Sequence, residues 1–198
     1  MQRWAGFAAA YAFLGAVSAV VVVVWGSGSP WFHPAPWLAH GHAASHAYSV
    51  ALGVAVGLLV VMSTRAMVGR FSWARRLHTE LRPLARGMSV AAIATLAILS
   101  AIGEELLFRS LLMPWLGLVP QALLFGFVHQ IRGPSRWVWV AWASIIGLLL
   151  GAIFQLSGSL LGAIAAHALI NGLNLAFLKS HDPDPPRRVL GGLLGQRG

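Results

Sequence analysis

The segment MSVAAIATLAILSAIGEELLFRSLLM, residues 88–113, decides how the chain can fold. It is long and apolar enough to span a bilayer, yet it contains Glu104, Glu105 and Arg109. A charged side chain in hydrocarbon costs several kcal/mol unless it is paired or faces water. On a helix, Glu105 and Arg109 lie four residues apart on one face, so we expect them to neutralise each other. Glu104 is turned away from Glu105 by about 100° and has no such partner, which makes it the candidate for chemistry.

The composition is that of a membrane protein. Of the 198 residues, 58% are hydrophobic and only 10% are charged, whereas about a quarter of a soluble domain is charged. We expect an all-α fold, a polytopic transmembrane helical bundle of about six membrane segments. One of them is too short to cross a bilayer alone. The apolar segments are residues 5–25, 43–62, 88–113, 119–130 (the short one), 137–156 and 159–178.

The basic residues indicate the orientation of the chain. Apart from Arg109, the Lys and Arg residues precede the first segment or follow the second, fourth and sixth segments. With six crossings they all fall on one side, which the positive-inside rule makes cytoplasmic, together with both termini. The net charge of +9 therefore indicates a lipid bilayer, and no nucleic acid, as the partner. Residues 1–180 are expected to form one membrane-embedded domain, and residues 181–198 a disordered cytoplasmic tail.

Three features outside the charged segment are open to more than one interpretation. Residues 65–87 mix apolar side chains with arginines, which indicates an interfacial amphipathic helix or a plain cytoplasmic loop. Several histidines in and after the first outer loop could bind a metal, but a solvated loop is favoured. Paired small residues favour close helix packing over function. The histidines are His33, His40, His42 and His46, and the paired glycines are Gly53/Gly57, Gly147/Gly151 and Gly158/Gly162.

Polar side chains also interrupt other apolar segments. His129 ends the fourth segment, and the sixth contains His167, Asn171 and Asn174 on one helix face. Each is costly in lipid and needs partners, so we expect them to share a water-filled site with Glu104. Counting depth along the helices places His129 nearer the cytoplasm than Glu104, unless the short segment is tilted or displaced.

These residues form three motifs that resemble one known family. EELLFR at 104–109, F-x-x-x-H at 125–129 and H-x-x-x-N at 167–171 occur in this order on successive membrane segments. The set resembles the CPBP family, which comprises the CAAX proteases, the bacteriocin-processing enzymes and their bacterial relatives, also called Abi proteins. The resemblance covers about residues 88–178, the motif-bearing core of a CPBP-like protease domain.

The resemblance implies hydrolysis of a peptide bond inside the membrane. Glu104 would activate water as general base, with His129 helping to polarise it. His167 and Asn171 would hold the oxyanion, and one such hydrogen-bond donor contributes about 3–4 kcal/mol. Glu105 and Arg109 would be a structural support for the helix that presents Glu104.

The cofactor requirement is left open by the sequence. Family members are often described as metalloproteases, and Glu104, His129 and His167 could form a zinc site with an open fourth position. The same three residues also serve a metal-free glutamate mechanism. Because the HExxH motif is absent, we favour the mechanism that requires no cofactor.

The sequence lacks the residues that cysteine and aspartyl protease mechanisms require. There is no cysteine for thiolate catalysis, and no Asp precedes Asp182, which excludes an aspartyl dyad. Two functions of other classes stay open, a non-catalytic membrane immunity or scaffold protein and a small proton-coupled transporter. The resemblance implies a protein or peptide substrate, and the sequence leaves open whether that substrate is lipidated or membrane-anchored. The small size, the compact loops and the resemblance favour the bacterial inner membrane as the location, with an organellar membrane as the alternative.

Overall fold

The computed structural model describes residues 3–25 and 28–183 of the chain. The expected tail lies outside the described residues from position 184 onward. Within the described ranges all named elements are helices, and the single β-contact is an isolated bridge between Phe32 and Ser159. The all-α prediction is confirmed.

Five helical stretches of the described chain are long and apolar enough to cross a membrane. Together with one short apolar helix, they confirm the predicted membrane bundle. The five stretches are α1 (Arg3–Trp25), α2 (His42–Arg70), α4 (Val90–Glu105) with its continuation, α7 (Arg136–Ser157) and α8 (Leu160–Ser180). The continuation of α4 is a π-helix, η1 (Leu106–Leu112), followed by α5 (Met113–Leu116), and the short helix is α6 (Leu118–Val128).

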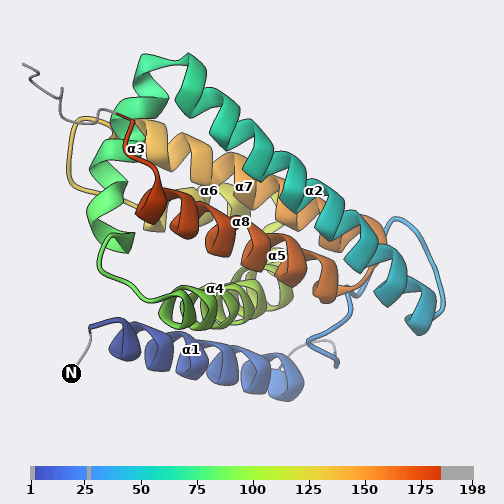
Figure 1. Cartoon of the computed structure of the whole chain (residues 1–198). Helices are drawn as coiled ribbons and strands as arrows, with labels where there is room; N and C mark the ends of the chain where they lie inside the picture. Colours follow the sequence, from blue (N-terminus) through green and yellow to red (C-terminus); the bar gives the residue numbers. More distant parts are fainter. Residues whose placement is uncertain (1–2, 26–27, 184–198) are drawn as a thin grey trace, which may run out of the picture.

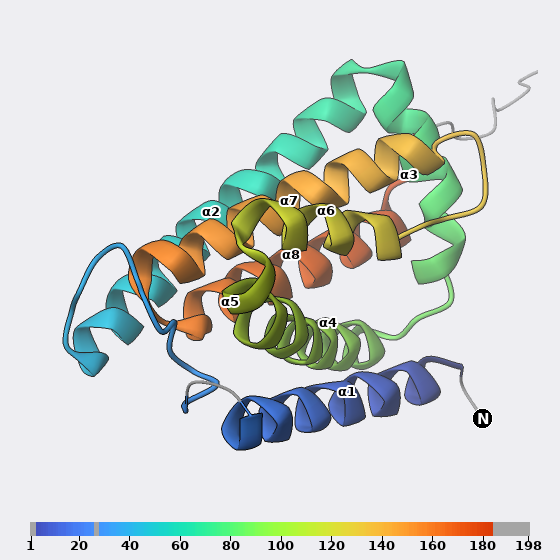
Figure 2. The same ribbon diagram turned by 180° about the vertical axis from the view of Figure 1, so that it is seen from behind.

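Helix α8 lies between α2 on one side and α4 on the other, and α1 covers the far side of α4 (Figure 1). Seen from behind, α6 runs beside α7 (Figure 2). The contact between α2 and α8 needs small residues, because a methyl group on Gly53 would collide with the backbone carbonyl of Gly162. One on Gly57 would press on the backbone of Ala166. The packing expected for Gly53 and Gly57 is therefore confirmed.

Gly158 serves a turn instead. Its φ of 74° is the left-handed conformation that favours glycine, and it ends α7 immediately before α8 begins. Its partner in the predicted pair, Gly162, packs directly against the backbone and hydroxyl of Ser49 on α2.

The linker after α2 contains a helix, α3 (Ser72–Ala85), so the loop interpretation is wrong for these residues. The apolar face of α3 packs on the bundle, where Leu77 and Leu81 join a cluster with Leu178. Burial of this face against protein is the reason that the segment is ordered as a helix.

Polar contacts fix α3 to two other parts of the chain. The Glu80 carboxylate accepts hydrogen bonds from the Ser135 amide (3.2 Å) and hydroxyl (2.9 Å) in the α6–α7 loop. Arg82 pairs with Asp182 at 2.9 Å, just beyond α8. The basic blocks after α2, α6 and α8 therefore lie at one end of the bundle, as a bundle with six membrane segments requires.

The connection between α1 and α2 folds over the opposite end. The amide of His33 donates to Gly158 O (3.0 Å), and the amide of Trp37 donates to Gln155 O (2.8 Å). The prediction of a solvated histidine loop is wrong for His33, which is buried with its ring edge-on to Phe154. His46 also has a partner, since its Nδ1 lies 2.7 Å from Ser159 Oγ.

Candidate active site

A hairpin brings Glu104 to His129. Gly117 separates α5 from α6 with a φ of 84°, which allows the chain to reverse sharply. Glu104 precedes Gly117 by 13 residues and His129 follows it by 12. On antiparallel helices, equal distances from the turn place both side chains at the same depth, about 20 Å from it.

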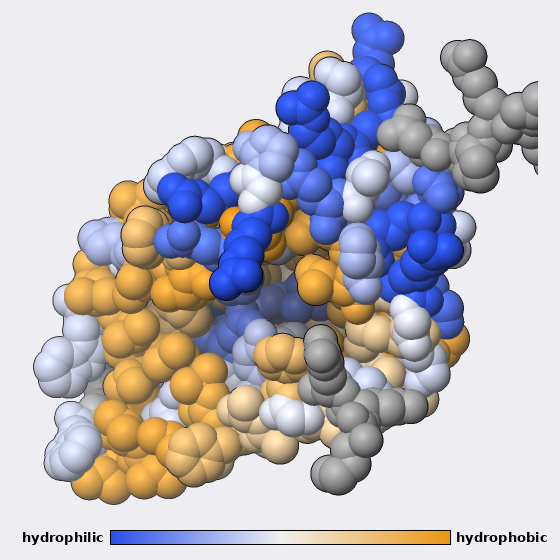
Figure 3. All heavy atoms as spheres, turned by 90° about the vertical axis from the view of Figure 1, so that its left-hand side faces the viewer, coloured by the Kyte–Doolittle hydropathy of each residue, from blue (hydrophilic) through white to orange (hydrophobic). Residues whose placement is uncertain are grey.

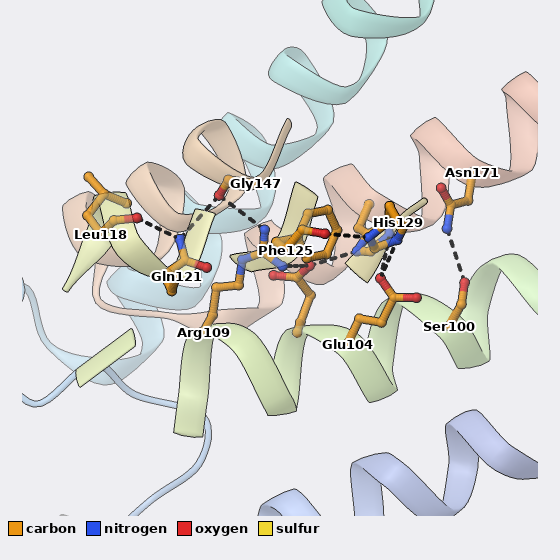
Figure 4. Close-up of polar contacts among 11 residues, drawn as sticks. Ser100, Glu104, Arg109, Leu118, Gln121, Phe125, His129, Gly147 and Asn171 are labelled. Atoms are coloured by element: carbon orange, nitrogen blue, oxygen red, sulfur yellow. Dashed lines mark hydrogen bonds and ion pairs between the residues drawn. The ribbon is translucent and has the colours of Figure 1, made fainter. Parts of the chain in front are cut away.

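Glu104 lies at the centre of the site and is buried. Its Oε2 is 3.3 Å from His129 Nε2 and 3.8 Å from His167 Nε2 (Figure 4). Both separations exceed that of a strong charge-assisted hydrogen bond, about 2.7–2.9 Å. This oxygen accordingly has no well-formed hydrogen bond to any residue that the structure describes.

Both imidazole rings are oriented by a partner on the far nitrogen. His129 Nδ1 lies 2.7 Å from Phe125 O and must donate, because a carbonyl oxygen only accepts. His167 Nδ1 lies 2.7 Å from Glu105 Oε1 and donates to that carboxylate. A neutral ring held in this way leaves the lone pair of its Nε2 facing Glu104. Three acceptors then converge, and a water molecule at this point has hydrogens for two of them.

Glu105 has a second partner, His167, which the sequence does not indicate. Its Oε1 accepts from Arg109 Nη1 at 2.9 Å, as expected from their spacing, and also binds His167. Arg109 is fully buried, and its Nη2 donates to Gly147 O at 3.1 Å. The acidic pair therefore divides its contacts between the two nitrogens of one histidine, with Glu105 at Nδ1 and Glu104 near Nε2.

Asn171 lies one turn beyond His167 on α8. Its Nδ2 donates to Ser100 Oγ at 3.1 Å, which ties α8 to α4 one turn before Glu104 (Figure 4). All four residues that the sequence proposes for chemistry are thus brought to the α4–α8 contact or to the neighbouring end of α6.

Sequence reasoning missed Tyr11 of α1, whose hydroxyl hydrogen bonds with the Glu104 carboxylate. The approach of the two helices depends on Gly103, where a methyl group would collide with Tyr11 O. The available signal was that Tyr11 is one of only two tyrosines and lies within an apolar segment.

A cavity of about 270 Å³ leads from the site toward α3. His129, His167 and Asn171 line its inner part, and Trp73 and Leu84 of α3 line its outer part. Seen from this end of the molecule, a hollow is visible with hydrophilic residues at its floor (Figure 3). The lining is mostly apolar, so the cavity presents a hydrophobic surface that ends at a polar centre.

The donor set of the site has the chemistry of a zinc site, with two imidazoles and a carboxylate. Nevertheless, no group of three or more His, Asp or Glu side chains in residues 3–25 and 28–183 is arranged to hold a metal ion. Zinc binding by Glu104, His129 and His167 stays a prediction, which metal analysis of the purified protein before and after chelation would check.

Fold and site together define a polytopic membrane protein with a buried glutamate–histidine centre. Residues 86–173 match the sequence profile of a family described as type II CAAX prenyl endopeptidase Rce1-like. The part of the chain that carries the three motifs is therefore similar to the CAAX prenyl endopeptidases, a family of peptidases.

One curated relative is YpbD of Bacillus subtilis (strain 168), which is named as an uncharacterized protein. It is 33% identical over 85 residues, which cover 43% of this chain and 44% of the relative. The match thus spans less than half of the relative's length. No solved structure matches the chain.

Proposed function

We propose that the chain is an intramembrane endopeptidase in which Glu104 activates water. The observation that carries the proposal is the convergence of His129 Nε2 and His167 Nε2 on Glu104 Oε2, within the segment that matches a peptidase family. The apolar cavity that leads to this point gives a membrane-embedded peptide access to it.

The chain's own residues suffice for hydrolysis. Water held between Glu104 and His129 gives a proton to Glu104, and the hydroxide attacks the carbonyl carbon of the scissile bond. The carbonyl oxygen becomes an oxyanion in the tetrahedral intermediate. Glu104 then delivers the proton to the leaving nitrogen, the C–N bond breaks, and a carboxylic acid and an amine form; the acid passes its proton to the amine as the products are released.

His167 and Asn171 stabilise the oxyanion. Glu105 Oε1, at 2.7 Å from Nδ1, holds the ring of His167 with its Nε2 toward the site, and its carboxylate stabilises the ring when a proton from the reaction reaches Nε2 for donation to the oxyanion. Asn171 has two amide hydrogens and gives one of them to Ser100, which leaves the other for the oxyanion. Loss of one donor of this kind typically lowers kcat by about 10² to 10³.

The substrate is a protein or peptide with a hydrophobic, membrane-anchored or lipid-carrying segment. The apolar lining of the cavity favours such a segment over a soluble polar loop. By the positive-inside rule, the α3 end and both termini face the cytoplasm, and a bacterial inner membrane fits the compact, arginine-flanked helices.

Proteomic comparison of cells that express either wild-type protein or Glu104→Gln tests the proposal. We expect at least one membrane substrate to accumulate uncut with Glu104→Gln, because an amide cannot take the proton from water. Glu80→Gln is the matched control, since Glu80 binds the α6–α7 loop outside the site, and it should behave as wild type. If biological activity survives both Glu104→Gln and His167→Ala, the protein acts by binding, as an immunity or scaffold protein would.

A further inference from the structure

The polar row on α8 has a third member to which the proposed chemistry gives no role. His167, Asn171 and Asn174 are spaced by four and then three residues, so they share one helix face, and all three line the same cavity. Asn174 lies nearest the α3 end. Its Oδ1 is buried and has no hydrogen-bond partner among the residues that the structure describes.

A buried amide oxygen without a hydrogen-bond partner destabilises a protein, so the group that pairs with it is of interest. The neighbouring hydroxyl in the cavity wall does not supply one, because Thr64 Oγ1 donates to Val60 O of its own helix at 2.9 Å. A group that enters the cavity can supply the missing donor.

We propose that Asn174 binds the main chain of the substrate, accepting a hydrogen bond from a peptide N–H close to the cleaved bond. The inference rests on the proposed function and adds a positioning residue to it. Asn174 follows His167 by seven residues, which corresponds to about 10 Å along the helix. An extended peptide spans about 3.3–3.6 Å per residue, so the contact falls about three residues from the scissile bond.

This contact determines how the substrate lies, not which side chains it carries. A main-chain N–H is present at every residue except proline. The wall of the cavity is mostly apolar and includes Met67 and Leu178. A peptide that enters as a helix has already used its N–H groups internally. Asn174 therefore selects an unwound, extended segment.

The test uses a fluorescence-quenched peptide built on the substrate sequence recovered by proteomics, with protein in liposomes. A series of peptides carries a single N-methyl group two, three or four residues from the cleaved bond, on either side. We expect Asn174→Leu to raise KM about 10-fold with little change in kcat, as the loss of one hydrogen bond predicts. One N-methylated peptide should show the same loss with wild-type protein and no further loss with Asn174→Leu.

Controls separate binding from folding. Asn174→Leu removes an unpaired polar atom, so its Tm should equal or exceed that of wild type, and Asn174→Ala provides a smaller replacement. Asn171→Leu should instead lower kcat. The inference would be overturned if KM is unchanged in both Asn174 variants. It would also be overturned if every N-methylated peptide raises KM by the same factor with Asn174→Leu as with wild-type protein. Failure of the proposed function looks different, since the peptide then stays uncut by wild type or is cut equally fast by Glu104→Gln.

Discussion

Arg109 connects three elements of the bundle through one buried side chain. It pairs with Glu105, donates to Gly147 O on α7, and places its guanidinium 4.3 Å from the ring centre of Phe125 on α6. Because Glu105 also binds His167, the charge balance at Arg109 extends to the ring that faces Glu104.

Arg109→Ala should therefore produce a folding defect. It leaves the Glu105 carboxylate buried with its charge uncompensated, a change that costs about 3–5 kcal/mol. Denaturation of purified protein in detergent measures the loss. The control is Arg136→Ala, which removes an exposed arginine stacked on Trp137 and should cost no more than about 1 kcal/mol. A fully expressed Arg109→Ala protein with wild-type stability would refute the supporting role of the pair.

At the scale of elements, the contact between α2 and α8 determines whether His167 and Asn171 reach the site. Gly53 lies on α2 with no room for a side chain, because Gly162 O occupies the position of its Cβ. A backbone carbonyl cannot rotate away as a side chain can, so a methyl group at this position must separate the two helices.

We predict that Gly53→Ala destabilises the protein by about 1–3 kcal/mol and lowers activity, as overpacking at a close helix contact does. Gly69→Ala is a matched control on the same helix, since nothing lies within 4 Å of its added methyl group. That control should be neutral or stabilising by up to about 1 kcal/mol, because alanine favours helix over glycine. Equal Tm values for the two variants would contradict the packing described for α2 and α8.

The sequence was sufficient to predict the long helices but not the depth of the short one. The apolar runs give segments that agree with α1, α7 and α8 within about two residues, since a bilayer requires helices of about 20 residues. The depth of α6 depends on the turn at Gly117, where the φ of 84° is not visible in hydropathy. Counting from that turn, and not from the membrane edge, would have placed His129 opposite Glu104.

The same limit applies to contacts within the site. The Glu105–Arg109 pair follows from local spacing on one helix and was predictable. The bond between Glu105 and His167 joins residues 62 positions apart, and the contact of Tyr11 with Glu104 depends on how α1 packs on α4. Such pairs are set by tertiary packing, which a single sequence does not specify.

For the whole molecule, the distribution of charge predicts the orientation in the membrane. The natural chain has no cysteine, so single cysteines can report accessibility without a background signal. Thr79→Cys on α3 should react with a membrane-impermeant thiol reagent only from the cytoplasmic side, and Ala39→Cys only from the outer side. Both positions are exposed, so burial does not limit the reaction. Labelling of Thr79→Cys in intact cells would reverse the proposed orientation.

The most direct measurement of the central claim is cleavage of the recovered substrate by purified, reconstituted protein in water enriched in ¹⁸O. The wild-type protein should place one ¹⁸O atom in the new carboxylate, because hydrolysis adds one oxygen atom of water to the scissile carbonyl carbon. Glu104→Gln should cleave about 10² to 10⁴ times more slowly while keeping the wild-type Tm. If Glu104→Gln instead cleaves at the wild-type rate, Glu104 is not the base and the proposed mechanism is wrong.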